Sequence, residues 1–377
     1  MRVYLDNAAT TPMADEVIDR MTEVMKGDYG NPSSIHAFGR NAKAIIENSR
    51  REVAKLINCL PKELIFTSGG TEADNMAILC SVLDLDVKHI ITSEIEHHAV
   101  GHACEATNRK HNVKVSFVKL DEFGQIDLEN LEELLKESDQ KTLVSLMHAN
   151  NEIGTLLPIK EVSDICRKYN AYFHSDTVQT MGHYEINVEE LDIDFITCAA
   201  HKFHGPKGIG FLYVNKKLLI KPFIEGGSQE RGLRGGTENI SGIVGLTKAL
   251  ELASGDLRNH QNHVQALKTY MIDSLRTAIP NVQFHGDIRP SSSLYTVLNV
   301  CFPPFGKQEM LLFMLDLEGV ACSGGSACTS GASSGSHVLR GIKADATRSN
   351  VRFSFSRYTT KDEVDFAIEK IKKIIEL

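Results

Sequence analysis

The feature that most constrains the fold of this chain is an alternation of short apolar runs with helical patterns over residues 64–214. The runs are rich in β-branched and aromatic side chains, and most are followed by a longer segment with helical spacing. Parallel strands need a crossover connection, usually a helix, so this order predicts a mainly parallel sheet covered by helices. The expected strands are 64–67, 89–92, 113–118, 143–147, 171–175, 195–198 and 210–214, and the expected helices are 72–83, 98–109, 128–136 and 159–169.

The pattern changes after about residue 240. A long helical stretch covers 240–277, and shorter helices and strands follow it to the end of the chain. A chain of 377 residues is too long for one small domain, so two lobes or one large α/β domain are expected. We therefore predict a division of the chain near residue 258.

Composition excludes several classes of protein. Lys and Arg number 41 against 49 Asp and Glu, a net charge of −8, which argues against a basic nucleic-acid-binding face. No apolar run is long enough to span a bilayer. The first residues, MRVYLDNAATTP, do not resemble a signal peptide, because Asp6 and polar residues follow at once. We expect a cytoplasmic protein that binds neither nucleic acid nor membrane.

Cysteine usage points to one unusual thiol. Without a secretory signal and without any CxxC pair, a disulfide framework or zinc ribbon is not expected, and most cysteines are predicted to be small buried hydrophobes. Cys328 differs, because ten of the fourteen residues in 323–336 are Gly or Ser. We predict that this segment is a mobile loop and that its thiol is chemically used. The eight cysteines are Cys59, Cys80, Cys104, Cys166, Cys198, Cys301, Cys322 and Cys328.

The segment TSGGTEADN, residues 67–75, follows a predicted strand and opens a predicted helix. Gly69 and Gly70 allow a ligand to approach the backbone, and Thr71 adds a hydroxyl at a helix N-terminus, where free N–H groups favour an anion. The segment is a candidate phosphate cradle. The alternative is an ordinary turn in which Thr71 caps the helix.

Three further side chains follow predicted strands. Asp176 lies at the end of one strand, Lys202 follows the next, and His97 follows another. Taken singly, Asp176 is explained as a cap, Lys202 as a solvated surface charge and His97 as a helix cap. Together with a phosphate cradle they are the parts that pyridoxal phosphate needs: a lysine for a Schiff base, an Asp for the pyridinium nitrogen, and an imidazole that stacks or moves protons.

The segment RFSFSRYTT, residues 352–360, alternates as a strand does. Arg352 shares a face with Ser354 and Ser356, opposite Phe353 and Phe355. A guanidinium in this position is suited to bind a substrate carboxylate through two parallel hydrogen bonds. The alternative is a surface salt bridge.

Taken together, these segments resemble the cysteine desulfurases of the NifS/IscS type, in the class-V aminotransferase family. The resemblance implies the pyridoxal-phosphate-dependent transferase fold of type I: a large domain over residues 15–258 with a mainly parallel seven-stranded sheet, and a smaller α+β domain made of 1–14 and 259–377. The motifs that carry it are YLDNAATTP, GNPSSIHAFGR, TSGGTEADN, EHHAV, MHANNEIG, SDTVQ, AHKFHGPKG, RGGTEN, SGGSACTSG and VRFSFSR.

The resemblance also implies an activity, in which the sulfur of L-cysteine is removed to give L-alanine and a persulfide on Cys328. The sulfur then passes to an iron–sulfur scaffold or to another acceptor. Lys202 is expected to hold pyridoxal phosphate and to move the substrate's α-proton. Thr237 is expected to reach the cofactor phosphate of a neighbouring subunit in a homodimer. The other implied contacts are Asp176, Asn151, Gln179 and His97 around the ring, Gly70, Thr71 and His201 at the phosphate, and Arg352 with Asn7 at the substrate carboxylate.

One departure from the family pattern concerns the phosphate. Ala199 stands where the family commonly has a serine whose hydroxyl contacts the phosphate. Either one hydrogen bond is missing, or Thr197 replaces it.

Other functions remain open at this point. An aminotransferase or a selenocysteine lyase would share Lys202 and Asp176 without needing Cys328. A metal-binding protein would use His201, His204, Cys322 and Cys328, although their spacing fits no tetrahedral motif and we expect no metal. A scaffold protein would leave Lys202 unmodified. Cys322 is expected to be a packing residue, with a relay or spare thiol as the alternative.

Overall fold

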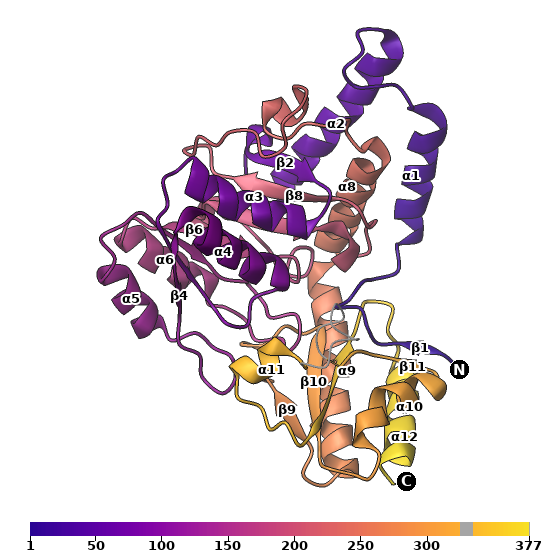
Figure 1. The fold of residues 1–377 in the computed structure, drawn as a ribbon. Helices are drawn as coiled ribbons and strands as arrows, with labels where there is room; N and C mark the ends of the chain where they lie inside the picture. Colours follow the sequence, from indigo (N-terminus) through magenta and orange to yellow (C-terminus); the bar gives the residue numbers. More distant parts are fainter. Residues whose placement is uncertain (325–334, 377) are drawn as a thin grey trace.

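A seven-stranded sheet forms the centre of the protein in the computed structural model, which describes residues 1–324 and 335–376 (Figure 1). The strand order is β2-β8-β7-β6-β5-β3-β4. All neighbours are parallel except β8, which runs antiparallel to both β2 and β7. The predicted mainly parallel sheet is thus confirmed. Its strands are β2 (Leu64–Thr67), β3 (His89–Thr92), β4 (Lys114–Phe117), β5 (Thr142–Ser145), β6 (Tyr172–Asp176), β7 (Phe195–Ala199) and β8 (Gly210–Val214).

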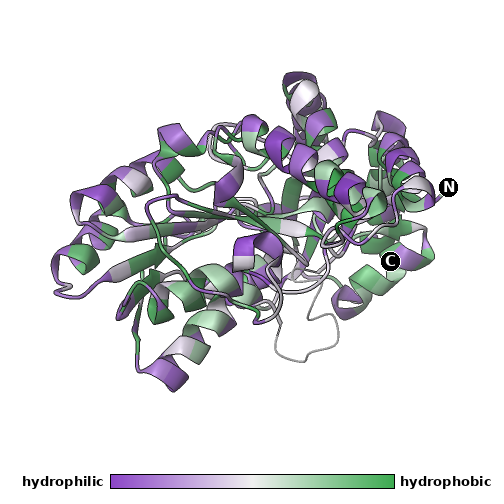
Figure 2. Ribbon diagram, turned by 90° about the horizontal axis from the view of Figure 1, so that it is seen from above, coloured by the Kyte–Doolittle hydropathy of each residue, from purple (hydrophilic) through white to green (hydrophobic). Residues whose placement is uncertain are grey.

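Helices cover both faces of this sheet. One face packs against α1, α2, α5, α6 and α8, and the other against α3 and α4. Hydrophobic and hydrophilic residues alternate around the outer helices, as amphipathic packing requires (Figure 2). These helices are α1 (Asp15–Gly27), α2 (Ala37–Leu56), α3 (Gly70–Leu83), α4 (His98–His111), α5 (Leu128–Lys136), α6 (Ile159–Lys168), the short α7 (Val188–Leu191) and α8 (Ile240–Gly255).

A second core lies beside the first and draws on both ends of the chain. An antiparallel sheet in the order β12-β10-β9 packs against α9, α10 and α12, and the strand pair β1–β11 brings the N-terminal residues to the same core. Figure 1 shows the N-terminus beside the orange and yellow C-terminal elements. The elements are β1 (Val3–Tyr4), α9 (Leu257–Ala278), β9 (Gln283–His285), β10 (Val297–Phe302), α10 (Leu311–Leu317), β11 (Val320–Ala321), α11 (His337–Gly341), β12 (Ser349–Ser354) and α12 (Lys361–Ile375).

The expected elements agree with those observed to within two residues at most ends. The long helical stretch predicted over 240–277 is divided at Asp256 into α8 and α9. The predicted domain boundary near 258 falls in the first turn of α9, and the assignment of 1–14 and 259–377 to a separate domain remains a prediction. Among the helices of the described chain, none combines the length and apolar character needed to cross a membrane.

Candidate active site

A cavity of about 240 Å³ lies at the carboxyl ends of the central strands, where parallel sheets bind ligands. Nine of the predicted site residues line it together. Asn7, which is also a predicted site residue, directly precedes the lining residue Ala8 in the sequence. The nine are Gly70, Thr71, His97, Asn151, Asp176, Gln179, His201, Lys202 and Arg352.

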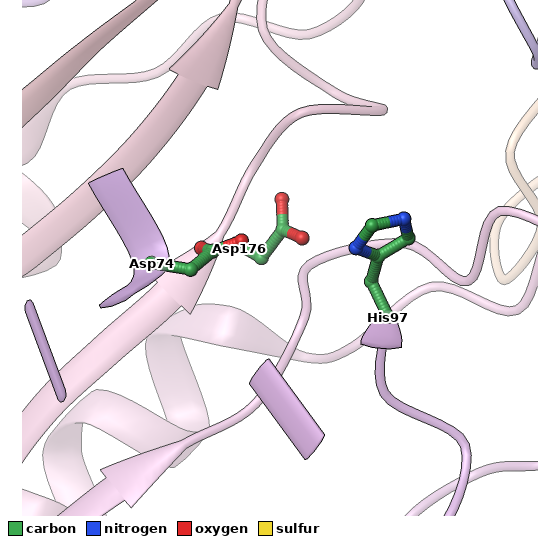
Figure 3. A group of neighbouring side chains, drawn as sticks. All are labelled: Asp74, His97 and Asp176. Carbon is green, nitrogen blue, oxygen red and sulfur yellow. The ribbon is translucent and has the colours of Figure 1, made fainter. Parts of the chain in front are cut away.

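The innermost wall of the cavity carries two carboxylates. Asp176 is the last residue of β6, and its Oδ1 accepts a hydrogen bond of 2.8 Å from the Val178 N–H. Asp74, from α3, is 1% exposed, and its Oδ1 has no hydrogen-bond partner. Each of these carboxylates and His97 offers one atom within 4.8 Å of the others (Figure 3). Burial raises the pKa of both carboxyls to about 7, and for Asp176 the charge of Asp74 adds to this effect.

A hydrogen-bonded histidine lies behind the carboxylate pair. His174 is fully buried and places Nε2 3.5 Å from Asp74 Oδ1 and 3.1 Å from Thr197 Oγ1. Its Nδ1 is 2.8 Å from Ser145 Oγ. Burial lowers the pKa of His174 to about 4, so the ring is neutral near pH 7. The Thr197 hydroxyl is therefore engaged with His174. This argues against the alternative that Thr197 contacts the phosphate in place of the serine that the family commonly has at position 199.

Lys202 reaches the cavity from a short 3₁₀ turn after β7, Ala200–Lys202. Its Nζ donates hydrogen bonds to the carbonyls of Ala8 and Ala9, at 2.6 and 2.9 Å. Gln179 Nε2 also donates to the Ala8 carbonyl, at 3.0 Å. The N-terminal segment is thus held against the lysine. His201 Nδ1 lies 3.2 Å from Thr10 Oγ1, on the same segment.

The candidate phosphate cradle is present at the start of α3. Gly69 caps the helix with φ of +153°, a conformation that side chains other than glycine rarely adopt. A Cβ on Gly70 would lie 2.9 Å from Val178 Cγ2, so the cavity wall leaves no room for one. Thr71 is exposed in the first turn and is not the cap. The backbone N–H groups of this turn are consequently open to an anion.

His97 serves as a helix cap and also faces the cavity. Its Nδ1 accepts a hydrogen bond of 3.2 Å from the Ala99 N–H at the start of α4. Burial, together with the nearby charge of Lys202, lowers the pKa of His97 to about 4. The imidazole is neutral near pH 7, and because Nδ1 accepts the Ala99 N–H, Nε2 carries the proton and is a hydrogen-bond donor.

Arg352 enters the cavity from β12 of the smaller sheet. It is 1% exposed, which rules out the surface salt bridge. Its two terminal nitrogens donate to Asp6 Oδ1 and to the Asn151 carbonyl, each at 2.9 Å, while its buried Nε has no partner. Asn7 Nδ2 donates to the Ser354 carbonyl at 2.9 Å and holds the N-terminal segment on the same strand.

Among the predicted site residues that the structure describes, Thr237 lies away from this cavity. Thr237 is exposed in the loop before α8, so its expected role across a subunit interface stays a prediction. Cys328 lies outside the described residues. Burial raises the pKa of Cys322 to about 12, as expected of a packing thiol. In the part of the chain that the structure describes, no group of converging metal-ligand atoms includes His201, His204 or Cys322.

The sequence reasoning missed Asp74, Asp6 and the carbonyls of Ala8 and Ala9. Asp74 stands in the motif TSGGTEADN and Asp6 in YLDNAATTP, so both signals were present in the quoted segments. Their roles depend on which face of α3 is buried and on how the N-terminus packs against β12. No local pattern shows either relation.

The residues fit pyridoxal phosphate. A buried carboxylate pair with an unpartnered oxygen suits a pyridinium nitrogen, the glycine turn suits a phosphate, and the lysine amine lies in the same cavity. Asp176, Asp74, Gly70 and Lys202 would hold the group.

Comparison with known proteins agrees with this site. The family model for aminotransferase class-V matches residues 3–366. A protein named cysteine desulfurase IscS from Dictyoglomus turgidum is 43% identical, over 99% of this chain and 94% of its own length. A solved NifS-like protein has a TM-score of 0.91 and 36% identity, with full coverage of both chains. A solved SspA in complex with cysteine has a TM-score of 0.80 and 30% identity, covering 95% of this chain and all of its own. The chain belongs to the aminotransferase class-V family, and its relatives within that family include cysteine desulfurases.

Proposed function

We propose that this protein is a pyridoxal-phosphate-dependent cysteine desulfurase, which converts L-cysteine to L-alanine and transfers the sulfur to Cys328. One observation carries the proposal: a lysine amine, a buried carboxylate pair and a buried guanidinium share one cavity in a chain whose full-length relatives are named cysteine desulfurases. A solved relative was obtained in complex with cysteine, which supports this amino acid as the substrate.

Pyridoxal phosphate, when bound, supplies an electron sink for negative charge that develops at the substrate's α-carbon. A pyridinium nitrogen would favour the ionised forms of Asp176 and Asp74, whose pKa values are raised without it, and these carboxylates would in turn keep the nitrogen protonated. The Lys202 amine is positioned by the Ala8 and Ala9 carbonyls, and it moves the α-proton. Gly70 and Thr71 offer N–H groups to the phosphate.

The substrate is oriented from the opposite side of the cavity. Arg352 receives the carboxylate, because its guanidinium is buried and its Nε has no protein partner. The hydrogen bond from Arg352 to the Asn151 carbonyl fixes the plane of the guanidinium. The neutral His97 ring carries its proton on Nε2 and can donate it in a hydrogen bond to a group that enters the cavity.

Sulfur transfer is assigned to Cys328. Its thiolate bonds to the sulfur of L-cysteine, the carbon–sulfur bond of the substrate breaks, and the α-carbon skeleton leaves as L-alanine after protonation. An iron–sulfur scaffold or another protein then receives the sulfur. A homodimer in which Thr237 reaches the neighbouring site, and a cytoplasmic location, are parts of the same proposal.

Mass spectrometry of the intact protein after exposure to L-cysteine tests this function. We expect one added sulfur on Cys328, and no such addition in Cys328→Ala, which keeps its cofactor absorbance but releases no sulfide. Cys322→Ala is the matched control and retains the activity. Sulfide release by Cys328→Ala at the parent rate would instead indicate a lyase that does not use this thiol.

A further inference from the structure

A cluster of three histidines lies outside the active site, beside a separate cavity of about 680 Å³. His98 and His102 are one helical turn apart on α4, with ring centroids separated by 5.0 Å. His337, the first residue of α11, approaches from the other side, with its ring centroid 4.4 Å from that of His98. None of the three rings has a part in the proposed sulfur chemistry.

We propose that His98, His102 and His337 bind a divalent transition-metal ion of the Zn²⁺ class and thereby join α4 to α11. Two histidines at i and i+4 on one helix face form a recurrent pair of zinc ligands. With metal–nitrogen distances of about 2.0–2.1 Å, two imidazoles in tetrahedral geometry have centroids roughly 5 Å apart. The separations measured around His98 are close to that value.

The hydrogen bonds of His337 fix the nitrogen that it can offer. Its Nε2 lies 2.8 Å from the Glu96 carbonyl oxygen, which can only accept, so Nε2 carries the proton. Nδ1 then bears the lone pair. Donation of the second ring N–H to a backbone carbonyl is the arrangement that metal-bound histidines commonly show.

His98 supplies the second observation that points to a ligand. Its Nε2 is buried and has no hydrogen-bond partner, a costly condition that a metal ion would relieve. Burial and the neighbouring rings of His337 and His102 lower the pKa of His98, so the ring stays neutral, as metal binding requires. The ligand atoms of the three rings do not yet converge within 4.8 Å of one another, and His102, which is exposed, has to turn toward the other two rings to complete the site.

Acidic and basic side chains both line this cavity. Glu94 and Glu105 line it, and the carboxylate of Glu105 is available as a fourth ligand or as a hydrogen-bond acceptor for a bound water. Arg109 and Arg340 also line the cavity, and Arg109 lies 3.8 Å from Glu105. Imidazole with one carboxylate suits Zn²⁺ better than Mg²⁺ or Ca²⁺.

The test measures metal binding directly and does not depend on turnover. The full-length holoenzyme carries Cys328→Ala, because a free thiol also binds zinc, and Zn²⁺ affinity is measured by competition with a chromophoric chelator. We expect one Zn²⁺ per chain, and a visible absorption band when Co²⁺ replaces it. His102→Asn and His337→Asn should each weaken Zn²⁺ binding at least tenfold and abolish the Co²⁺ band.

His111→Asn is the matched control, since His111 is an exposed histidine at the end of the same helix. It should bind Zn²⁺ as the parent does. The proposal is overturned if the parent binds no stoichiometric Zn²⁺. It is also overturned if either His102→Asn or His337→Asn binds Zn²⁺ as tightly as the parent.

Discussion

The two sides of the active-site cavity are built in different ways. The cofactor side comes from the ends of adjacent strands: Asp176 ends β6, and Lys202 follows β7 by three residues. The substrate side joins Arg352, near the C-terminus, to Asp6, near the N-terminus. Side chains on the first side are positioned by the parallel sheet itself, whereas those on the second depend on packing between distant parts of the chain. Variants on the two sides should therefore fail in different ways.

The largest effect is expected on the cofactor side, from Lys202→Ala. Loss of the amine removes both the attachment point and the group that moves the α-proton, so cysteine desulfuration should fall by roughly 10³-fold or more. Absorbance before and after borohydride reduction measures the attachment. Lys207→Ala, an exposed lysine on the same loop, is the control and should keep both properties. Attachment that persists in Lys202→Ala would place the cofactor on another lysine.

The substrate side is tested by Arg352→Gln. We expect kcat/KM for L-cysteine to fall about 10²-fold, roughly 3 kcal/mol, mainly through KM, because a buried charged hydrogen-bonding partner of the carboxylate is lost. The cofactor spectrum should not change. Steady-state kinetics and absorbance together separate this outcome from a cofactor defect.

Arg352→Gln also removes the guanidinium partner of the half-buried Asp6 carboxylate, which then keeps only the hydrogen bond from the Ser323 hydroxyl, and this destabilises the fold. The double variant Asp6→Asn with Arg352→Gln should recover part of the stability but none of the affinity for L-cysteine. Recovery of KM in the double variant would show that Arg352 acts on the fold alone.

The same division explains how much the sequence could predict. The strands that carry Asp176 and Lys202 follow from local alternation, and their convergence follows from the rule that parallel strands share an edge. Arg352 was identified as a strand residue, but its burial against Asp6 depends on the strand pair β1–β11, which is only two residues long. The antiparallel direction of β8 was likewise not specified by any local pattern. Pairing of distant short strands is decided by packing, and a single sequence contains no direct record of it.

On the cofactor side, Asp74 is expected to make folding stability depend on pH. In the cofactor-free protein the pKa of Asp74 is about 7, above the ordinary value of 3.8, because the group is buried. The unfolded chain loses this proton at lower pH than the folded protein does, so folding stability should decrease as pH rises from about 4 to about 7. Asp74→Asn should remove this contribution, on the order of 2 kcal/mol, and make the profile less steep, while Asp176, whose pKa is also raised to about 7, continues to contribute.

Urea unfolding of the cofactor-free protein at several pH values measures this profile. Asp84→Asn serves as a comparison, since Asp84 lies at the C-cap of the same helix and outside the cavity. Profiles of equal slope for Asp74→Asn and the parent would contradict a protonated Asp74.

The smallest predicted effect concerns a contact that links the two sides. Ser336 caps α11 by accepting from the Leu339 N–H, and its hydroxyl donates to the buried carboxylate of Glu152, in the loop that also carries Asn151. Ser336→Ala should lower the free energy of unfolding by about 1 kcal/mol through the lost cap. It should also raise KM for L-cysteine slightly, because the Asn151 carbonyl orients Arg352.

Thr360→Ala is the matched control for Ser336→Ala, because Thr360 caps α12 in the same manner but makes no contact with the cavity. It should lower stability by a similar amount and leave KM unchanged. Chemical unfolding and steady-state kinetics on both variants separate the loss of stability caused by the missing helix cap from the effect on KM of the lost Ser336–Glu152 contact. If both variants alter KM equally, the coupling between the two sides runs through the stability of the smaller core and not through Glu152. If only Ser336→Ala does so, the loop that holds Glu152 and Asn151 is the element through which the C-terminal part of the chain positions the substrate.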